Sequence, residues 1–143
     1  MAWRSYVAIG DSFTEGLDDL DAVTGAFRGW ADLVAMRLAA DVPEFTYANL
    51  AIRGRLFDNI VDEQVPEALR MQPDLFSFAA GGNDALRRGF EAARLVTRLD
   101  TVVKTLRASG ADVIVFRWAD VTGRLPGQRM ILPRVSALNN AIA

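Results

Sequence analysis

The chain has 143 residues, the usual size of a single domain, and it is long enough to form a hydrophobic core. Its formal net charge of −2 gives no electrostatic reason to expect binding to nucleic acid or to an anionic membrane surface. The absence of cysteine excludes disulfides and thiolate metal sites. The absence of histidine removes the side chain that most often serves as a general base near neutral pH.

The N-terminal residues show no targeting segment. The apolar run 6–9 is too short for the core of a signal peptide, and no cleavage site follows it. No stretch of the chain approaches the roughly 20 apolar residues that a membrane-spanning helix needs. We therefore expect a cytoplasmic protein with no membrane span.

The first half of the chain alternates short apolar runs with a longer amphipathic segment. The predicted elements are, in order, a strand (6–10), a loop (14–28), a helix (30–40) and a strand (45–50). The helix is predicted from four apolar residues at helical spacing: Trp30, Leu33, Val34 and Leu38. The second strand is favoured by its aromatic and β-branched residues.

The second half continues the same alternation. The predicted elements are a helix (56–69), a strand (75–80), a helix (90–108), a strand (112–118), a loop (123–133) and a helix (135–143). Pro66 is expected to interrupt or end the first of these helices, because proline lacks the backbone N–H that a helix interior needs. Gly110 supplies the stop signal of the long second helix.

This alternation predicts a single α/β domain over residues 1–143, in the order β-α-β-α-β-α-β-α. Continuous apolar strands separated by helices indicate a parallel sheet that is covered by helices on both faces. In such a fold a helix normally leads back to another strand, and the last predicted helix does not. We therefore expect the domain to be incomplete at its C-terminal end.

Three loops are candidate functional segments, because each follows a predicted strand at the end where open α/β sheets bind ligands. In the first loop, Gly-Asp-Ser at 10–12 places the Ser12 hydroxyl beside exposed backbone N–H groups. In the second, Gly54 can present its N–H to a ligand without a side chain in the way. In the third, Gly-Gly-Asn-Asp at 81–84 lets the Asn83 amide project as a donor. Each also has a simpler explanation, as a helix cap, a turn residue and ordinary turn chemistry respectively.

Together the three loops resemble the motifs of the SGNH (GDSL-type) hydrolase family, since all three come in order on the expected elements along the whole chain. The resemblance implies a three-layer α/β/α sandwich with a parallel sheet in the flavodoxin-like order 2-1-3-4. In the family a fifth strand normally completes this sheet, so we expect this domain to be truncated before its last strand.

The resemblance also implies an activity, the hydrolysis of a carboxylic ester or a thioester through an acyl-serine intermediate. Ser12 would be the nucleophile. The backbone N–H groups of Ser12 and Gly54, with the side-chain amide of Asn83, would form the oxyanion hole, in which each donor is worth about 3–4 kcal/mol. Asp11 and Asp84 belong to the same motifs and would hold loop backbone groups in place.

One block of the family is absent from this sequence. Members carry an Asp-x-x-His segment that supplies the general base and its orienting carboxylate, and nothing in this chain matches it. A serine hydroxyl without a base is a poor nucleophile, and losing the base costs on the order of 10⁶ in turnover. An aspartate such as Asp11 or Asp84, with a reference pKa near about 3.9, is a weak base at neutral pH. We expect the 143-residue chain by itself to be nearly inactive.

Two groups of charged residues are further candidates, and for both a solvated surface is the favoured interpretation. The acidic group lacks the spacing of a calcium-binding loop and comprises Glu15, Asp18, Asp19 and Asp21. The basic group is a candidate contact for an acidic part of a substrate and comprises Arg87, Arg88, Arg94 and Arg98. The sequence implies no metal and no organic cofactor, and the expected partner is a small-molecule ester rather than a nucleic acid.

Two other functions stay open. The absence of histidine supports a non-catalytic relative that binds acyl or glycan ligands without turning them over. A flavodoxin-like regulatory or phosphate-binding module would need a glycine-rich phosphate loop, or an acidic phosphoacceptor site with a lysine. The chain has one lysine, Lys104, which lies inside the predicted helix 90–108 and disfavours that module.

Overall fold

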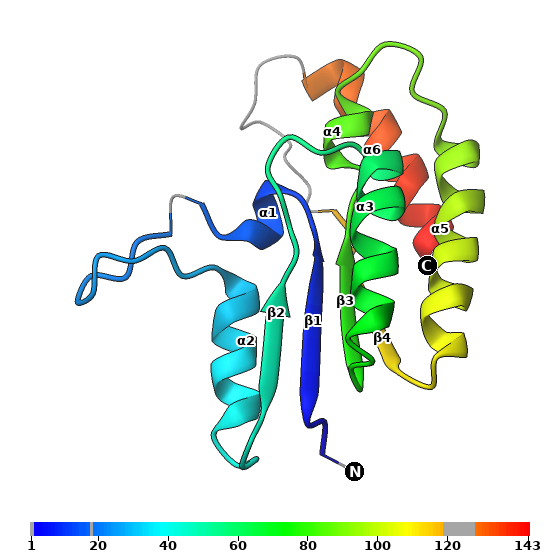
Figure 1. Ribbon diagram of the computed structural model, residues 1–143. Helices are drawn as coiled ribbons and strands as arrows, with labels where there is room; N and C mark the ends of the chain where they lie inside the picture. The colour runs from blue at the N-terminus through cyan, green and yellow to red at the C-terminus, as the bar shows by residue number, and fades with distance from the viewer. Residues whose placement is uncertain (1, 18, 119–127) are drawn as a thin grey trace.

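The computed structural model describes residues 2–17, 19–118 and 128–143. Its sheet is parallel and has the strand order β2-β1-β3-β4, which confirms the predicted fold (Figure 1). The strands are β1 (Ser5–Gly10), β2 (Thr46–Asn49), β3 (Leu75–Ala79) and β4 (Asp112–Val115). The helices are α1 (Ser12–Glu15), α2 (Trp30–Ala39), α3 (Phe57–Arg70), α4 (Gly82–Ala85), α5 (Ala92–Ala108) and α6 (Gln128–Ile142).

The main hydrophobic core lies between the sheet and the helices α3, α5 and α6. Alternate residues of the two central strands point into it, as the period of a β-strand requires. Val7 and Ile9 of β1 lie beside Phe76 and Phe78 of β3 in this cluster. Leu138 of α6 is fully buried in the same cluster, so α6 belongs to this layer. Figure 1 shows the three helices together on one side of the sheet.

The opposite face of the sheet is covered by α2. Tyr6 and Ala8 of β1 point to this side, where Ala31 and Ala35 of α2 are buried against them. Among the described residues no helix extends this layer over β4, and Ile114 at the middle of that strand is 40% exposed. Helices therefore cover both faces of the sheet, as predicted, but they cover them unequally.

Both helical prolines contradict the sequence-based boundaries. Pro66 was expected to interrupt or end its helix, yet α3 runs through it to Arg70. Pro133 was expected to lie in a loop, yet α6 begins at Gln128 and runs through it. Both prolines are on exposed positions, where water can hydrogen-bond the carbonyl left without a helical partner. In both helices the packing of the buried face outweighs the local free-energy cost of the proline. The remainder of the predicted loop, 123–127, lies outside the described residues.

Other differences concern short segments. Residues 81–84 were expected to lie in a loop, and most of them belong to the single helical turn α4. The fourth strand was predicted over 112–118 and ends at Val115, the last residue that pairs with β3. Leu33 was predicted on the apolar face of its helix and is exposed, since the smaller Ala31 and Ala35 are the residues buried against the sheet.

Candidate active site

Ser12 lies at the point where β1 becomes α1. The Asp11 side chain caps this short helix, because its Oδ1 accepts a hydrogen bond from the Phe13 N–H at 3.2 Å. Ser12 itself is the first helical residue, and its side chain is exposed while Asp11 is buried. The cap is thus Asp11, so the alternative interpretation of Ser12 as the capping residue is wrong.

Gly10 makes this tight connection possible. A Cβ at Gly10 would lie 2.7 Å from the Ala79 carbonyl oxygen of β3 and 2.7 Å from Oγ1 of Thr14. Thr14 is completely buried, so neither neighbour can move aside. Glycine is required here by the close approach of α1 to the end of β3.

Gln64 of α3 hydrogen-bonds both backbone polar groups of Gly10. Its Oε1 accepts from the Gly10 N–H and its Nε2 donates to the Gly10 carbonyl, both at 2.9 Å. Gln64 is buried with only 3% exposure. Sequence reasoning missed this residue, although a glutamine on the buried face of a helix is a signal that a backbone group needs a partner there.

The second loop is tied to α1 at three points. Asn49 at the end of β2 donates from Nδ2 to the Thr14 carbonyl at 2.9 Å. The Arg53 N–H donates to Oε2 of Glu15 at 2.7 Å, and the Arg53 guanidinium approaches Oε1 of the same carboxylate at 3.4 Å. Gly54 follows with φ of +74° and is exposed. Because no atom would meet a Cβ at Gly54, backbone conformation rather than crowding favours glycine at this position.

Asn83 of α4 connects all three loops. Its Nδ2 donates to the carbonyl of Arg55, beside Gly54, at 3.0 Å. The same nitrogen lies 3.5 Å from Oδ2 of Asp11, beside Ser12. The three predicted segments therefore meet at the carboxyl edge of the sheet, with Ser12 exposed and Asn83 half-buried. The catalytic roles of Ser12, Gly54 and Asn83 stay predictions.

Asp84 stabilises the start of α3 beside the site. Its Oδ2 accepts from the Phe57 N–H at 2.9 Å and so caps the start of α3 from a different loop. Desolvation raises the pKa of Asp84, and the hydrogen bond from Phe57 partly offsets this. Desolvation also raises the pKa of Asp11, where the hydrogen bond from Phe13 opposes the shift and the charge of Asp84 adds to it. Both carboxyl groups thus act as acceptors for backbone and amide N–H groups, the positioning role expected of them.

An apolar cleft opens beside Ser12 and has a volume of about 320 Å³. Phe13, next to Ser12, and Gly82, next to Asn83, form the part of its wall nearest the site. Trp118 and Phe116 follow β4 and pack around Phe13, with ring centroids 6.2 and 5.9 Å away. Val135 and Leu138 of α6 close the far side. An aliphatic chain suits such a surface.

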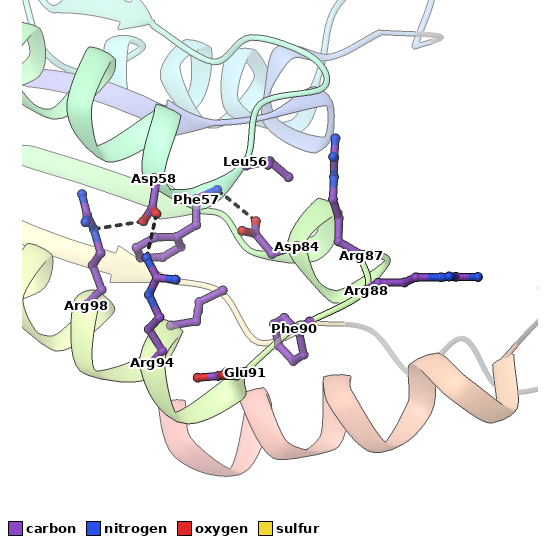
Figure 2. Close-up of a pocket in the computed structure, with 12 residues that line it drawn as sticks. Leu56, Phe57, Asp58, Asp84, Arg87, Arg88, Phe90, Glu91, Arg94 and Arg98 are labelled. Carbon is purple, nitrogen blue, oxygen red and sulfur yellow. Dashed lines mark hydrogen bonds and ion pairs between the residues drawn. The ribbon is translucent and has the colours of Figure 1, made fainter.

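A second, polar cleft of about 170 Å³ lies between the starts of α3 and α5 (Figure 2). Asp84, which follows Asn83, and Leu56, which follows Arg55, connect it to the site. Its other charged lining residues are Asp58, Glu91, Arg87, Arg88, Arg94 and Arg98. The four arginines of the predicted basic group therefore lie around one cleft.

The predicted acidic group does not come together. Glu15 binds Arg53, whereas Asp21 accepts from the backbone N–H groups of Val23 and Thr24 and pairs with Arg28 at 2.7 Å. Asp18 lies outside the described residues. Within the described part of the chain, no three acidic, histidine or cysteine side chains are arranged to hold a metal ion.

Similar proteins share this architecture. The structure of TesA is 26% identical in sequence with a TM-score of 0.71, over 96% of this chain and 69% of that one. A lipase/acylhydrolase from Enterococcus faecalis is 27% identical with a TM-score of 0.69, over 96% and 68% of the two chains. LAE5, an α/β hydrolase from the metagenome of Lake Arreo, is 18% identical with a TM-score of 0.75, over 97% and 70%, and shows the shared fold. No curated protein matches the chain.

The fold and the arrangement of its three loops define an SGNH-type α/β/α protein. The model of the GDSL-like lipase/acylhydrolase family matches residues 8–143, and the chain belongs to that family. This confirms the resemblance inferred from the three motifs. Across the residues that the structure describes, no helix is both long and apolar enough to span a membrane.

Proposed function

We propose that this chain carries the nucleophile and the oxyanion hole of a serine hydrolase acting on carboxylic esters or thioesters. Ser12 Oγ attacks the substrate carbonyl carbon, its proton passes to a base, and the carbonyl oxygen becomes negatively charged. The N–H groups of Ser12 and Gly54 and the amide of Asn83 stabilise that oxygen. Collapse of the intermediate expels the alcohol or thiol and leaves an acyl-serine ester for water to hydrolyse.

The observation that carries this proposal is the position of the Asn83 amide. Its Nδ2 donates to the Arg55 carbonyl at 3.0 Å, which holds the amide where the three loops meet. The same nitrogen makes only a long contact of 3.5 Å with Oδ2 of Asp11. Because an amide nitrogen carries two hydrogens, Asn83 can donate to a developing oxyanion while it keeps the bond to Arg55, and an oxyanion at bonding distance is a better acceptor than the distant carboxylate oxygen.

The base is the part that these 143 residues do not supply, since they contain no histidine. Asp11 is buried and already accepts from Phe13, while Asp84 caps α3. Neither carboxylate is free to take the proton of Ser12. We therefore expect the chain alone to turn over esters very slowly, and an imidazole provided from solution to accelerate the reaction by accepting that proton.

The test compares the chain with its Ser12→Ala variant in labelling by a fluorophosphonate and in hydrolysis of p-nitrophenyl butyrate, with and without added imidazole. The variant measures the hydrolysis that imidazole performs by itself. Ser136→Ala, which removes an exposed serine of α6, is the matched control. Labelling and imidazole-dependent turnover should be lost only in Ser12→Ala.

Equal labelling of the chain and Ser12→Ala would remove Ser12 from the nucleophile role. A chain that binds esters but shows no Ser12-dependent labelling under any condition would instead be the non-catalytic ligand-binding relative.

A further inference from the structure

A helix of a single turn, α4, carries Asn83. It has four residues, and the backbone groups at the ends of any helix lack partners within that helix. One turn is also unstable in isolation, because the first turn fixes several backbone dihedrals for a single hydrogen bond. The position of the Asn83 amide therefore depends on the bonds that the rest of the protein makes to α4.

The C-terminal end of α4 is bound by Arg134 of α6. Nη1 of Arg134 donates to the carbonyl oxygen of Ala85, the last residue of the turn, at 2.9 Å. The same nitrogen donates to the carbonyl oxygen of Arg87 at 2.7 Å. A terminal guanidinium nitrogen carries two hydrogens, one for each carbonyl. One side chain thus binds both of the carbonyls at which the turn ends.

The Arg134 side chain is itself held in this contact. Its guanidinium lies over the ring of Phe90, 5.9 Å from the centroid. The side chain is half-buried, and among the described residues no carboxylate lies within ion-pair distance of it. A charge removed from water needs hydrogen-bond partners. The two carbonyls and the aromatic ring are therefore the groups that stabilise this charge.

The N-terminal end of α4 contacts the same helix, through Leu138. Residues four apart share one face of an α-helix, so Leu138 and Arg134 point to the same side of α6. Leu138 is completely buried, and its Cδ2 lies 3.4 Å from the place that a Cβ at Gly81 would take. The face of α6 that contacts α4 thus touches the turn both before and after Asn83 (Figure 1).

The other polar contacts of α4 lie on its opposite side. The Asn83 amide binds the carbonyl of Arg55, just before α3, and Asp84 binds the N–H of Phe57 at the start of α3. Both bonds connect α4 to α3, whereas the bonds of Arg134 connect it to α6. Without Arg134 the turn keeps polar contacts on one side only, and the amide of Asn83 can shift relative to Ser12.

From these contacts we propose that Arg134 is a positioning residue, which fixes α4 so that the Asn83 amide lies where it can donate to the oxyanion. This inference rests on the proposed hydrolase function. Arg134 acts through the backbone of α4 and touches no reacting atom. Stabilisation of an oxyanion requires donors at a fixed place, and a displacement of about 1 Å can cost roughly 10² in rate. Loss of Arg134 should lower turnover and spare substrate binding.

The test follows the Asn83 amide and the reaction separately in Arg134→Ala. Nuclear magnetic resonance of the isotope-labelled chain reports the side-chain amide of Asn83, whose signals are identified by their loss in Asn83→Asp. These signals should move in Arg134→Ala, and their hydrogens should exchange faster with water. In hydrolysis of p-nitrophenyl butyrate at a fixed imidazole concentration, kcat should fall about tenfold while KM changes less than about twofold.

Chemical rescue distinguishes a positioning role from a general loss of stability. Methylguanidinium can fill the space left in Arg134→Ala and donate to the two carbonyls. It should restore part of kcat and return the Asn83 signals toward those of the parent chain, whereas sodium chloride at the same ionic strength should do neither. Arg134→Lys keeps the charge and a donor, so it should lie between the parent and the alanine variant, and it serves in its place if Arg134→Ala does not fold.

The matched control is Arg129→Ala, which removes an exposed arginine from the same helix. It should behave like the parent chain in both measurements, with and without methylguanidinium. Unchanged Asn83 signals in the Arg134 variants would overturn the inference. So would an unchanged Ser12-dependent kcat, or an equal effect of Arg129→Ala.

These outcomes are separable from the fate of the hydrolase proposal. Equal labelling of Ser12→Ala and the parent chain, with Asn83 signals that move only in the Arg134 variants, would sink the hydrolase and keep the dependence of Asn83 on Arg134. Labelling that is lost in Ser12→Ala, with Asn83 signals that stay in place in the Arg134 variants, would keep the hydrolase and sink the role of Arg134.

Discussion

Gln64 binds both polar groups of the Gly10 peptide backbone, with Oε1 and Nε2 each 2.9 Å from their partners. The Gly10 carbonyl has a second donor, the Ile52 N–H at 3.2 Å, whereas Gln64 is the side chain that satisfies the buried N–H. The end of β1, two residues before Ser12, is therefore held by a side chain from α3.

Replacing this glutamine should destabilise the protein through that one N–H group. Gln64→Met keeps the approximate volume and leaves the Gly10 N–H buried without a partner, which costs about 1–3 kcal/mol. Urea unfolding followed by circular dichroism measures the change. Asn140→Met, at an exposed position of α6, should alter stability far less, and similar losses in the two variants would contradict this account.

Gly16 and Gly29 bring the two ends of the α1–α2 connection into backbone contact. A Cβ at Gly29 would lie 2.5 Å from Cα of Gly16. Gly29→Ala should therefore destabilise the fold by about 1–3 kcal/mol, since backbone rather than a flexible side chain must move. Gly25→Ala is the comparison, because Gly25 has φ of +67° and open space around it. Its cost should be limited to backbone strain, about 1 kcal/mol. Thermal unfolding that ranks Gly25→Ala as the more damaging change would refute the contact as the cause.

Glu15 should control the order of the loop that contains Gly54. Removing its carboxylate in Glu15→Ala takes away the acceptor of the Arg53 N–H, so hydrogen exchange of that amide should become faster. Glu15→Gln keeps an acceptor oxygen and should retain most of the protection. Glu63→Ala, which removes only the 3.0 Å ion pair with the Arg55 guanidinium, serves as the control. Exchange at Arg53 that is equally slow in Glu15→Ala and the parent chain would show that the tether does not order the loop.

Asp11 should make stability depend on pH. Desolvation raises its pKa above the ordinary value of 3.8, so between that value and the higher folded-state pKa the folded protein binds more protons than the unfolded chain. The Asp11 contribution to the free energy of unfolding therefore falls as pH rises through this window. Asp11→Asn can still accept from the Phe13 N–H and should lack that part of the pH dependence. Urea unfolding at a series of pH values measures it, and identical profiles for the two proteins would contradict the raised pKa.

The sequence predicted the arrangement of the strands more securely than the ends of the helices. Apolar runs such as 6–10 and 75–80 mark buried strands because few other structures bury every residue in succession. The boundaries at Pro66 and Pro133 were wrong because a local rule about proline competes with the packing of a whole helical face, which depends on residues distant in sequence.

For the site, too, local features could be predicted from the sequence and long-range contacts could not. Ser12, Gly54 and Asn83 could be singled out because motif chemistry is local, and strand order then brings the loops together. The supports of these loops were not predicted, since Gln64 and Glu15 act through pairings across 54 and 38 residues. The role of these two side chains can be recognised only when the positions of their partner backbone groups are known.

The central position of β1 has a consequence for how such a site can change. Since β1 pairs with β2 on one side and β3 on the other, the serine-bearing loop has a donor-bearing loop on each flank. A shift of the loop after β2 or of the loop after β3 changes the position of that loop relative to Ser12 and leaves the other one in place. A shift of the loop after β1 changes both positions. Substitutions in the loops after β2 and β3 can therefore accumulate independently of each other. Recognition of the two ends of a bound molecule can diversify in this way while the loop that carries the serine stays in place.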